Sequence, residues 1–215
     1  MFLKFLLWTV LISAGLAVDC DNAKLHLCYP SMQKTLNLTV GQPWSYPEKF
    51  REEIEKLYGA EAKVGLRKIC QAFRAFLDCY GNTYRQCMVP MKIVGSGVTP
   101  KAAYEFVSVF SQFHYTCGAG VNVFVNAEVC MTKVWSSNKG ELDNARVRFN
   151  SKVDVVPDSA CDLAQTLLLK QYQIKFNECT IGGKFWACEY ARIYVFNRFP
   201  QCSLTCSSKI QKTSS

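Results

Sequence analysis

Apolar residues recur at intervals of three and four along most of the chain, which is the spacing of one face of an α-helix. The clearest case lies in the segment 60–80, whose apolar stripe comprises Leu66, Ile69, Phe73, Phe76, Leu77 and Tyr80. Gly81 follows this stripe directly and is the residue type that most often ends a helix. The pattern therefore predicts a long amphipathic helix over residues 60–80.

Capping residues mark the starts of further helices. Ser45 and Glu48 fit a capping box, and Thr99 stands immediately before Pro100, as at the start of a helix. Gly59 is expected to end the helix that begins near Ser45. The other helical segments are expected at 21–38, with a kink or break at Pro30, from 159, and from 180 to before 200. Residues 121–125 fit either a strand or a helix, and a helix that continues to about 135 is favoured. The fold class predicted is all-α, a disulfide-rich bundle of about six to eight helices.

Two polar stretches are expected to face solvent. Residues 136–157 are polar and aperiodic, which predicts a long surface loop with at most a turn of helix near 142–148. Glu52, Glu53 and Glu55 have lysines nearby, which is typical of a solvated helix face. The formal net charge is +8, but no run of five or six like charges is present. This scatter favours a solvated surface over a nucleic-acid or membrane patch.

The first seventeen residues have the organisation of a secretory signal peptide. Lys4 precedes an apolar run over 5–12, and small residues end at Ala17, the expected cleavage point. The alternative is a signal anchor, but this run is shorter than the roughly 20 residues of a membrane span. Residues 18–207 are then expected to form one extracellular, cysteine-rich helical domain, and 208–215 a flexible polar tail. The expected location is outside the cell, with no membrane span.

Cysteine number fixes the expected thiol chemistry. All twelve follow the predicted cleavage point: Cys20, Cys28, Cys70, Cys79, Cys87, Cys117, Cys130, Cys161, Cys179, Cys188, Cys202 and Cys206. An even number in an oxidising compartment predicts six disulfides. Zinc sites favour closer pairs than any found here, and neither histidine lies near the closest pair, so no metal and no cofactor is expected.

Matched spacings suggest how some cysteines pair. Two antiparallel helices with equal cysteine spacing can be joined twice, one bridge inside the other. The nested pairs predicted in this way are Cys20–Cys79, Cys28–Cys70, Cys130–Cys188 and Cys117–Cys202. The remaining four are assigned as Cys161–Cys179 and Cys87–Cys206. Spacing alone leaves the connectivity open, since twelve cysteines allow about ten thousand pairings.

Candidate chemistry is sparse elsewhere. The two histidines, His26 and His114, are expected to be packed or half-exposed side chains, and no nucleophile-elbow motif accompanies them. A catalytic triad assembled in space stays open at this point, but no catalytic residue is predicted. Asn37, Leu38 and Thr39 form a glycosylation acceptor next to a Gly-Pro turn, so Asn37 is expected to carry a glycan.

Four cysteine-containing stretches resemble those of a known family. They read CDNAKLHLC, ICQAFRAFLDCYGNTYRQC, YEFVSVFSQFHYTCGAGVNVFVNAEVC and FNECTIGGKFWACEYARIYVFNRFPQCSLTC, and together they span residues 20–206. Their cysteine number, order and spacing are similar to those of the twelve-cysteine secreted domain expanded in nematodes, domain of unknown function 19. Insect haemolymph cysteine-rich proteins are a weaker match. The resemblance implies an extracellular domain with no assigned activity and no known catalytic residues.

Three functions are compatible with this sequence. The favoured one is a non-catalytic extracellular module that binds or supports another secreted or surface protein. The alternative is a carrier of lipid or another apolar small ligand, and a hydrolase or inhibitor comes third. A closed cavity of several hundred Å³ would favour the carrier, and a packed core would favour the module. Partner identity and oligomeric state stay open.

Overall fold

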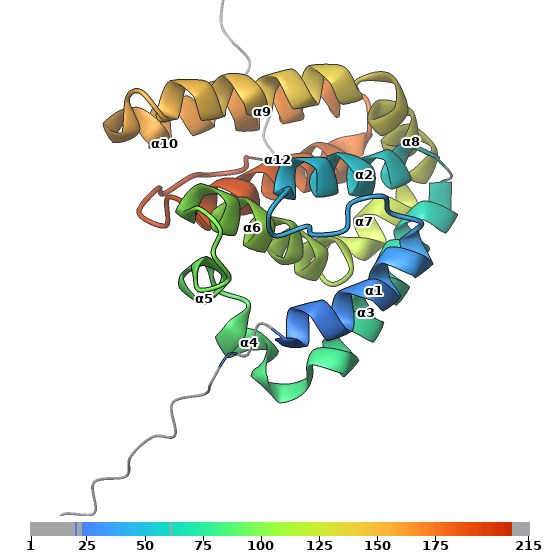
Figure 1. The fold of residues 1–215 in the computed structure, drawn as a ribbon. Coiled ribbons are helices and arrows are strands. Elements are labelled where there is room, and N and C mark those ends of the chain that lie inside the picture. The colour runs from blue at the N-terminus through green and yellow to red at the C-terminus, as the bar shows by residue number, and fades with distance from the viewer. Residues whose placement is uncertain (1–19, 21–22, 61, 208–215) are drawn as a thin grey trace, which may run out of the picture.

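The computed structural model describes residues 20, 23–60 and 62–207, and every regular element within them is helical (Figure 1). The all-α class is therefore confirmed. The predicted signal peptide and the polar tail lie outside the described residues. In chain order the α-helices are α1 (Ala23–Leu36), α2 (Pro47–Ala60), α3 (Ala62–Tyr80), α4 (Tyr84–Cys87), α5 (Pro90–Val94), α6 (Pro100–Thr116), α7 (Val121–Asn126), α8 (Glu128–Ser137), α9 (Lys139–Val153), α10 (Ala160–Leu163), α11 (Lys170–Lys175) and α12 (Thr180–Phe196). A π-helical segment, Ala164–Leu169, joins α10 to α11.

Local sequence signals explain several helix boundaries. Thr99 caps α6 as predicted, because its hydroxyl accepts a hydrogen bond from the amide of Ala102 at 3.2 Å. Gly81 adopts a positive φ of 68° directly after α3, which is the conformation of a helix C-terminal glycine. Helix α2 ends at Ala60, one residue after the predicted stop at Gly59. A Cβ atom on Gly59 would lie 2.8 Å from the backbone nitrogen of Ser136, so this glycine permits the close packing of α2 on α8.

The long loop predicted for residues 136–157 is wrong, because most of it forms α9. Figure 1 shows α9 as a straight helix across the top of the molecule, above α2, α6 and α12. Its buried positions follow helical spacing: Leu142, Ala145, Arg146, Phe149, Asn150 and Val153. Two of these six are polar, so the inner face of α9 carries no continuous apolar stripe. The hydrophobicity pattern did not predict this helix because two of its buried positions are an arginine and an asparagine.

All twelve cysteines are oxidised in six disulfides, as expected. The pairs are Cys20–Cys87, Cys28–Cys79, Cys70–Cys117, Cys130–Cys179, Cys161–Cys202 and Cys188–Cys206. None of the six predicted partnerships occurs.

The helix arrangement explains why the pairing predictions failed. Cys20 precedes α1 instead of lying on it, and it bonds to Cys87 at the end of α4. Cys28 is then left to join α1 to α3 through Cys79. Cys70, on another face of α3, bonds to Cys117 at the end of α6. Spacing along the chain does not specify which helix each face of α3 meets. The nested model assigned both cysteines of α3 to α1, whereas Cys79 faces α1 and Cys70 faces the end of α6.

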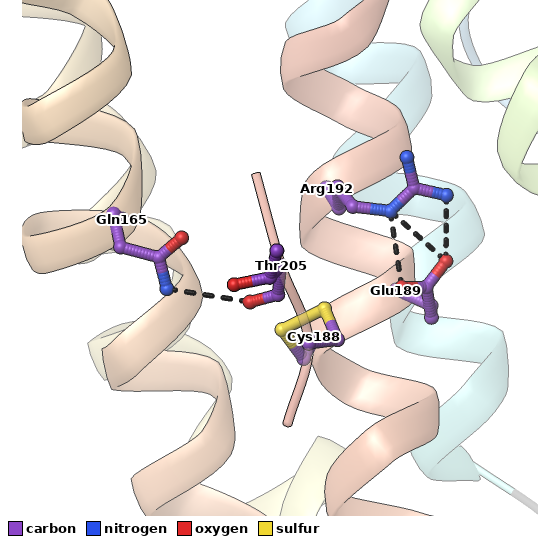
Figure 2. Close-up of a disulfide and its surroundings, with 6 residues drawn as sticks. Gln165, Cys188, Glu189, Arg192 and Thr205 are labelled. Atoms are coloured by element: carbon purple, nitrogen blue, oxygen red, sulfur yellow. Dashed lines mark hydrogen bonds and ion pairs between the residues drawn. A yellow bond between two sulfur atoms is a disulfide. The ribbon is translucent and has the colours of Figure 1, made fainter. Parts of the chain in front are cut away.

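The last described residues are held in an extended segment between two helices. The disulfide between Cys188 and Cys206 joins this segment to α12, as Figure 2 shows. On its other side the Gln165 side-chain amide donates a 3.5 Å hydrogen bond to the carbonyl of Thr205 (Figure 2). The last described residues therefore contact both α12 and the π-helical segment.

Glu55 lies in the core, so its predicted place on a solvated face is wrong. Its side chain is 0% exposed, and it accepts hydrogen bonds from Arg146 at 3.1 Å and from the hydroxyl of Tyr190 at 3.2 Å. Arg51, one helical turn earlier, is 1% exposed and lies 3.9 Å from Glu55. Buried charges of this kind are tolerated only when they are paired and hydrogen-bonded.

A second buried carboxylate extends this cluster. Glu105 of α6 accepts hydrogen bonds from the Asn150 amide at 3.2 Å and from the hydroxyl of Tyr194. Burial, reinforced by the negative charge of Glu48, raises the pKa of Glu105. The polar cluster thus joins α2, α6, α9 and α12 by buried hydrogen bonds.

The polar cluster helps to hold together two parts of the chain that no disulfide connects, because the disulfides form two separate sets. The first six cysteines pair among themselves, and so do the last six. No disulfide therefore links the part of the chain before α7 to the part after it. Apolar packing and the buried ion pair of Glu55 with Arg146 hold the two parts together.

Candidate functional site

A groove of about 710 Å³ lies between α3, the end of α6 and α7, and it is partly open to solvent. Its lining residues are Leu66, Arg67, Cys70, Gln71, Phe73, Arg74, Leu77, His114, Cys117, Gly118, Val121 and Val125. The volume falls within the roughly 300–1,000 Å³ typical of ligand sites in proteins. This groove is the candidate functional site.

The floor of the groove is apolar and recessed. It derives from the stripe of α3, where Leu66 and Phe73 are only 2% and 4% exposed and Leu77 is half-buried. Residues spaced by three or four along a helix share one face, which is why this stripe lines one side of the groove. The Cys70–Cys117 disulfide fixes α3 to the end of α6 and contributes to the same lining.

One rim of the groove carries hydrogen-bond donors without acidic partners. Arg67, Gln71 and Arg74 follow helical spacing along α3, beside the apolar stripe, and all three are exposed. Among the described residues neither arginine makes an ion pair or a side-chain hydrogen bond, and no Asp or Glu belongs to the groove lining. Elsewhere the ion-paired arginines are Arg51, Arg146, Arg192 and Arg198. The groove therefore concentrates uncompensated positive charge.

His114 lines the groove next to this rim. Its Nε2 atom lies 3.1 Å from the hydroxyl of Tyr84, and its ring meets the ring of Phe73 edge-on with centroids 4.8 Å apart. Partial burial and the nearby charge of Arg85 lower the pKa of His114. This shift favours the neutral form of the imidazole, which adds a polar group to the groove.

A second hollow lies beside the groove at its α7 end. This hollow has a volume of about 400 Å³ and shares Val125 with the groove. Val125 and Val129 are 38% and 81% exposed, and the Cys130–Cys179 disulfide lies in the same lining. Apolar surface therefore extends beyond the groove at Val125.

The two histidines are engaged in contacts with aromatic side chains. His26 packs edge-on against Trp44, with ring centroids 4.6 Å apart, and the hydrogen bond of His114 goes to a tyrosine. Within the described residues, neither arrangement resembles a histidine that activates a serine or cysteine. No group of three or more His, Cys, Asp or Glu side chains suited to a metal ion occurs in the part of the chain that the structure describes. No helix in this same part is long and apolar enough to cross a membrane.

Asn37, the predicted glycosylation site, is exposed directly after α1. It has a φ of 53°, the left-handed conformation that asparagine tolerates better than most residues at a helix end. The amide of Thr39 donates a 2.8 Å hydrogen bond to Glu53, which fixes the acceptor triplet on the surface. A glycan at this position would project into solvent.

We predict that Asn37 is glycosylated when the protein is secreted by eukaryotic cells. Glycosidase treatment should lower the apparent mass, and Asn37→Gln should abolish that shift, because the triplet supplies the acceptor amide. The measurement is a gel or mass-spectrometric comparison of treated and untreated protein. An unchanged mass of the wild-type protein would refute the prediction.

No family model, curated protein or solved structure matches the chain. The class of protein that the structure itself defines is a disulfide-rich all-α protein. The resemblance to domain of unknown function 19 stays a prediction that rests on its cysteine pattern.

The arginine rim is not among the predicted site residues, because the basic residues are scattered along the sequence. A usable pattern was present, since Arg67, Gln71 and Arg74 follow the same spacing as the apolar stripe and stand next to it. The sequence does not reveal where α7 lies. In the structure α7 faces this side of α3, and the groove lies between them.

Proposed function

We propose that this protein is a secreted, non-catalytic binding module and that the groove between α3, α6 and α7 is its binding site. The observation that carries this proposal is a recessed apolar floor beside arginines without acidic partners. Apolar lining with a few convergent polar groups is the usual composition of ligand sites.

Two further observations support this role. Six disulfides fit a protein that works in an oxidising, extracellular compartment. The core is filled by aromatic side chains in mutual contact; for example, Phe110 lies 4.9 Å from both Phe76 and Phe106 between ring centroids. A packed core favours a module that binds at its surface over a carrier that encloses its ligand.

The alternative, an extracellular carrier of lipid or another apolar small ligand, has one specific observation in its favour. The groove is large enough for such a ligand, at about 710 Å³. Both functions use the same groove, so the first experiment asks whether the groove binds an apolar molecule at all.

The test is a titration of the secreted full-length protein with Nile red, an uncharged dye whose emission rises in apolar surroundings. We expect saturable binding that Leu77→Glu weakens at least about tenfold, because a carboxylate on the floor must lose water when the dye binds. Leu27→Glu is the matched control, since Leu27 is 74% exposed on α1 and lies outside the groove lining. Equal binding by both variants, or no saturable binding by the wild type, would refute the proposal. Circular dichroism of each variant checks that the fold is retained.

A further inference from the structure

We propose that the groove binds a single-chain lipid with an anionic head group, such as a fatty acid. The head group would lie on Arg67, Gln71 and Arg74, and the chain along the apolar floor. This inference rests on the proposed function, and it specifies the class of ligand.

Charge complementarity defines the head group. Arg67 and Arg74 are seven residues apart on α3, about 10 Å along the helix axis, and Gln71 stands between them. Guanidinium groups bind carboxylates and phosphates through paired, charge-assisted hydrogen bonds. Because the groove lining contains no acidic side chain, an anion bound here meets no repulsion from the lining. Arg85 adds positive charge nearby, since it contributes to the lowered pKa of His114.

The recessed position and the length of the groove floor favour a ligand with a single acyl chain. Leu66 and Leu77 are eleven residues apart, about 16 Å along α3. Leu66 and Phe73 are too deeply buried to meet the broad face of a protein partner, whereas a narrow acyl chain can reach the recess above them. In the second hollow, Val125 and Val129 offer further apolar surface to a longer chain, next to Glu128 and Glu178 in the same lining.

Two occupants supplied by this protein itself are disfavoured by charge. The segment 208–215 contains Lys209 and Lys212 and no acidic residue, so it would bring like charge to the arginine rim. A second copy of the chain also carries a net positive charge, since the formal charge is +8. An external anion is the complementary partner.

The experiment compares four ligands of twelve carbons each that carry different head groups. Dodecanoate, dodecyl phosphate, dodecanol and dodecylammonium are titrated into the secreted protein by calorimetry, below the concentrations at which they aggregate. We expect at least one of the two anions to bind about tenfold or more tighter than dodecanol, and dodecylammonium to bind weakest. The preferred anion identifies the head group as carboxylate or phosphate, and either preference supports the proposal. Equal affinities for the anions and dodecanol would overturn it.

A double variant tests the assigned rim. Arg67→Gln with Arg74→Gln should reduce the affinity for the preferred anion about tenfold, to that of dodecanol, and leave dodecanol binding unchanged. Arg148→Gln is the matched control, because Arg148 lies on α9 outside the groove lining and, among the described residues, its side chain donates only to the carbonyl of Asn144. A double variant that keeps full anion affinity would overturn the assignment of the rim. Nile red is uncharged, so its binding reports on the groove alone. If the protein binds Nile red but shows no preference for the anionic ligands, this inference is overturned and the proposed function stays intact. If the protein binds neither Nile red nor the anionic ligands, the inference and the proposed function are both overturned.

Discussion

Glu55→Gln should lower the free energy of unfolding by about 3–5 kcal/mol, the usual cost of removing one partner from a buried ion pair. Glu55 is 0% exposed and lies within 3.1 Å of Arg146, 3.6 Å of Lys139 and 3.9 Å of Arg51. Glutamine keeps the shape of the side chain but removes the charge that compensates these cations. In a domain of about 200 residues the melting temperature should fall by roughly 6–20 °C, measured by circular dichroism.

Glu52→Gln is the matched control on the same helix. Glu52 is exposed, so its replacement should change stability by no more than about 0.5 kcal/mol. Adding Arg146→Met to Glu55→Gln should recover part of the lost stability, because it removes one of the uncompensated buried charges. A Glu55→Gln protein that melts with the wild type would show that the buried pair contributes little.

The helices that the sequence predicted well are those with local signals. The cap at Thr99, the stop at Gly81 and the stripe of α3 depend on neighbouring residues, so each can be inferred without knowledge of the fold. Helix α9 was missed because its inner face carries Arg146 and Asn150, whose partners lie on other helices. A polar residue in a sequence does not reveal whether a distant side chain will satisfy it.

The candidate site also depends on contacts between distant segments, which the sequence does not reveal. The even cysteine number predicted full oxidation correctly, because it leaves no cysteine without a possible partner. Which cysteine faces which depends on helix packing, and every predicted pair failed for that reason. The groove also arises from packing, since α7 closes one side of a helix face that alone would be an ordinary stripe beside two arginines.

Replacing both Cys70 and Cys117 with alanine should lower the free energy of unfolding by roughly 4 kcal/mol. This value follows from the entropy of closing a loop whose ends are 47 residues apart. The same relation gives roughly 3 kcal/mol for Cys188 and Cys206, which are separated by 18 residues. The Cys70/Cys117 double variant should therefore melt below the Cys188/Cys206 double variant. It should also bind Nile red more weakly, because the missing disulfide belongs to the groove lining.

A single Cys70→Ser change should be more harmful to secretion than the double change. It leaves the thiol of Cys117 without its partner in an oxidising compartment, where a thiolate can attack other disulfides and rearrange them. The measurement is the yield of monomeric secreted protein on non-reducing gels, with peptide mapping of the wild type to locate the Cys70–Cys117 bond. Equal secretion of the single and double variants would contradict this reasoning. A wild-type map that joined Cys70 to Cys28 would restore the nested pairing of α1 with α3 and remove the disulfide from the groove.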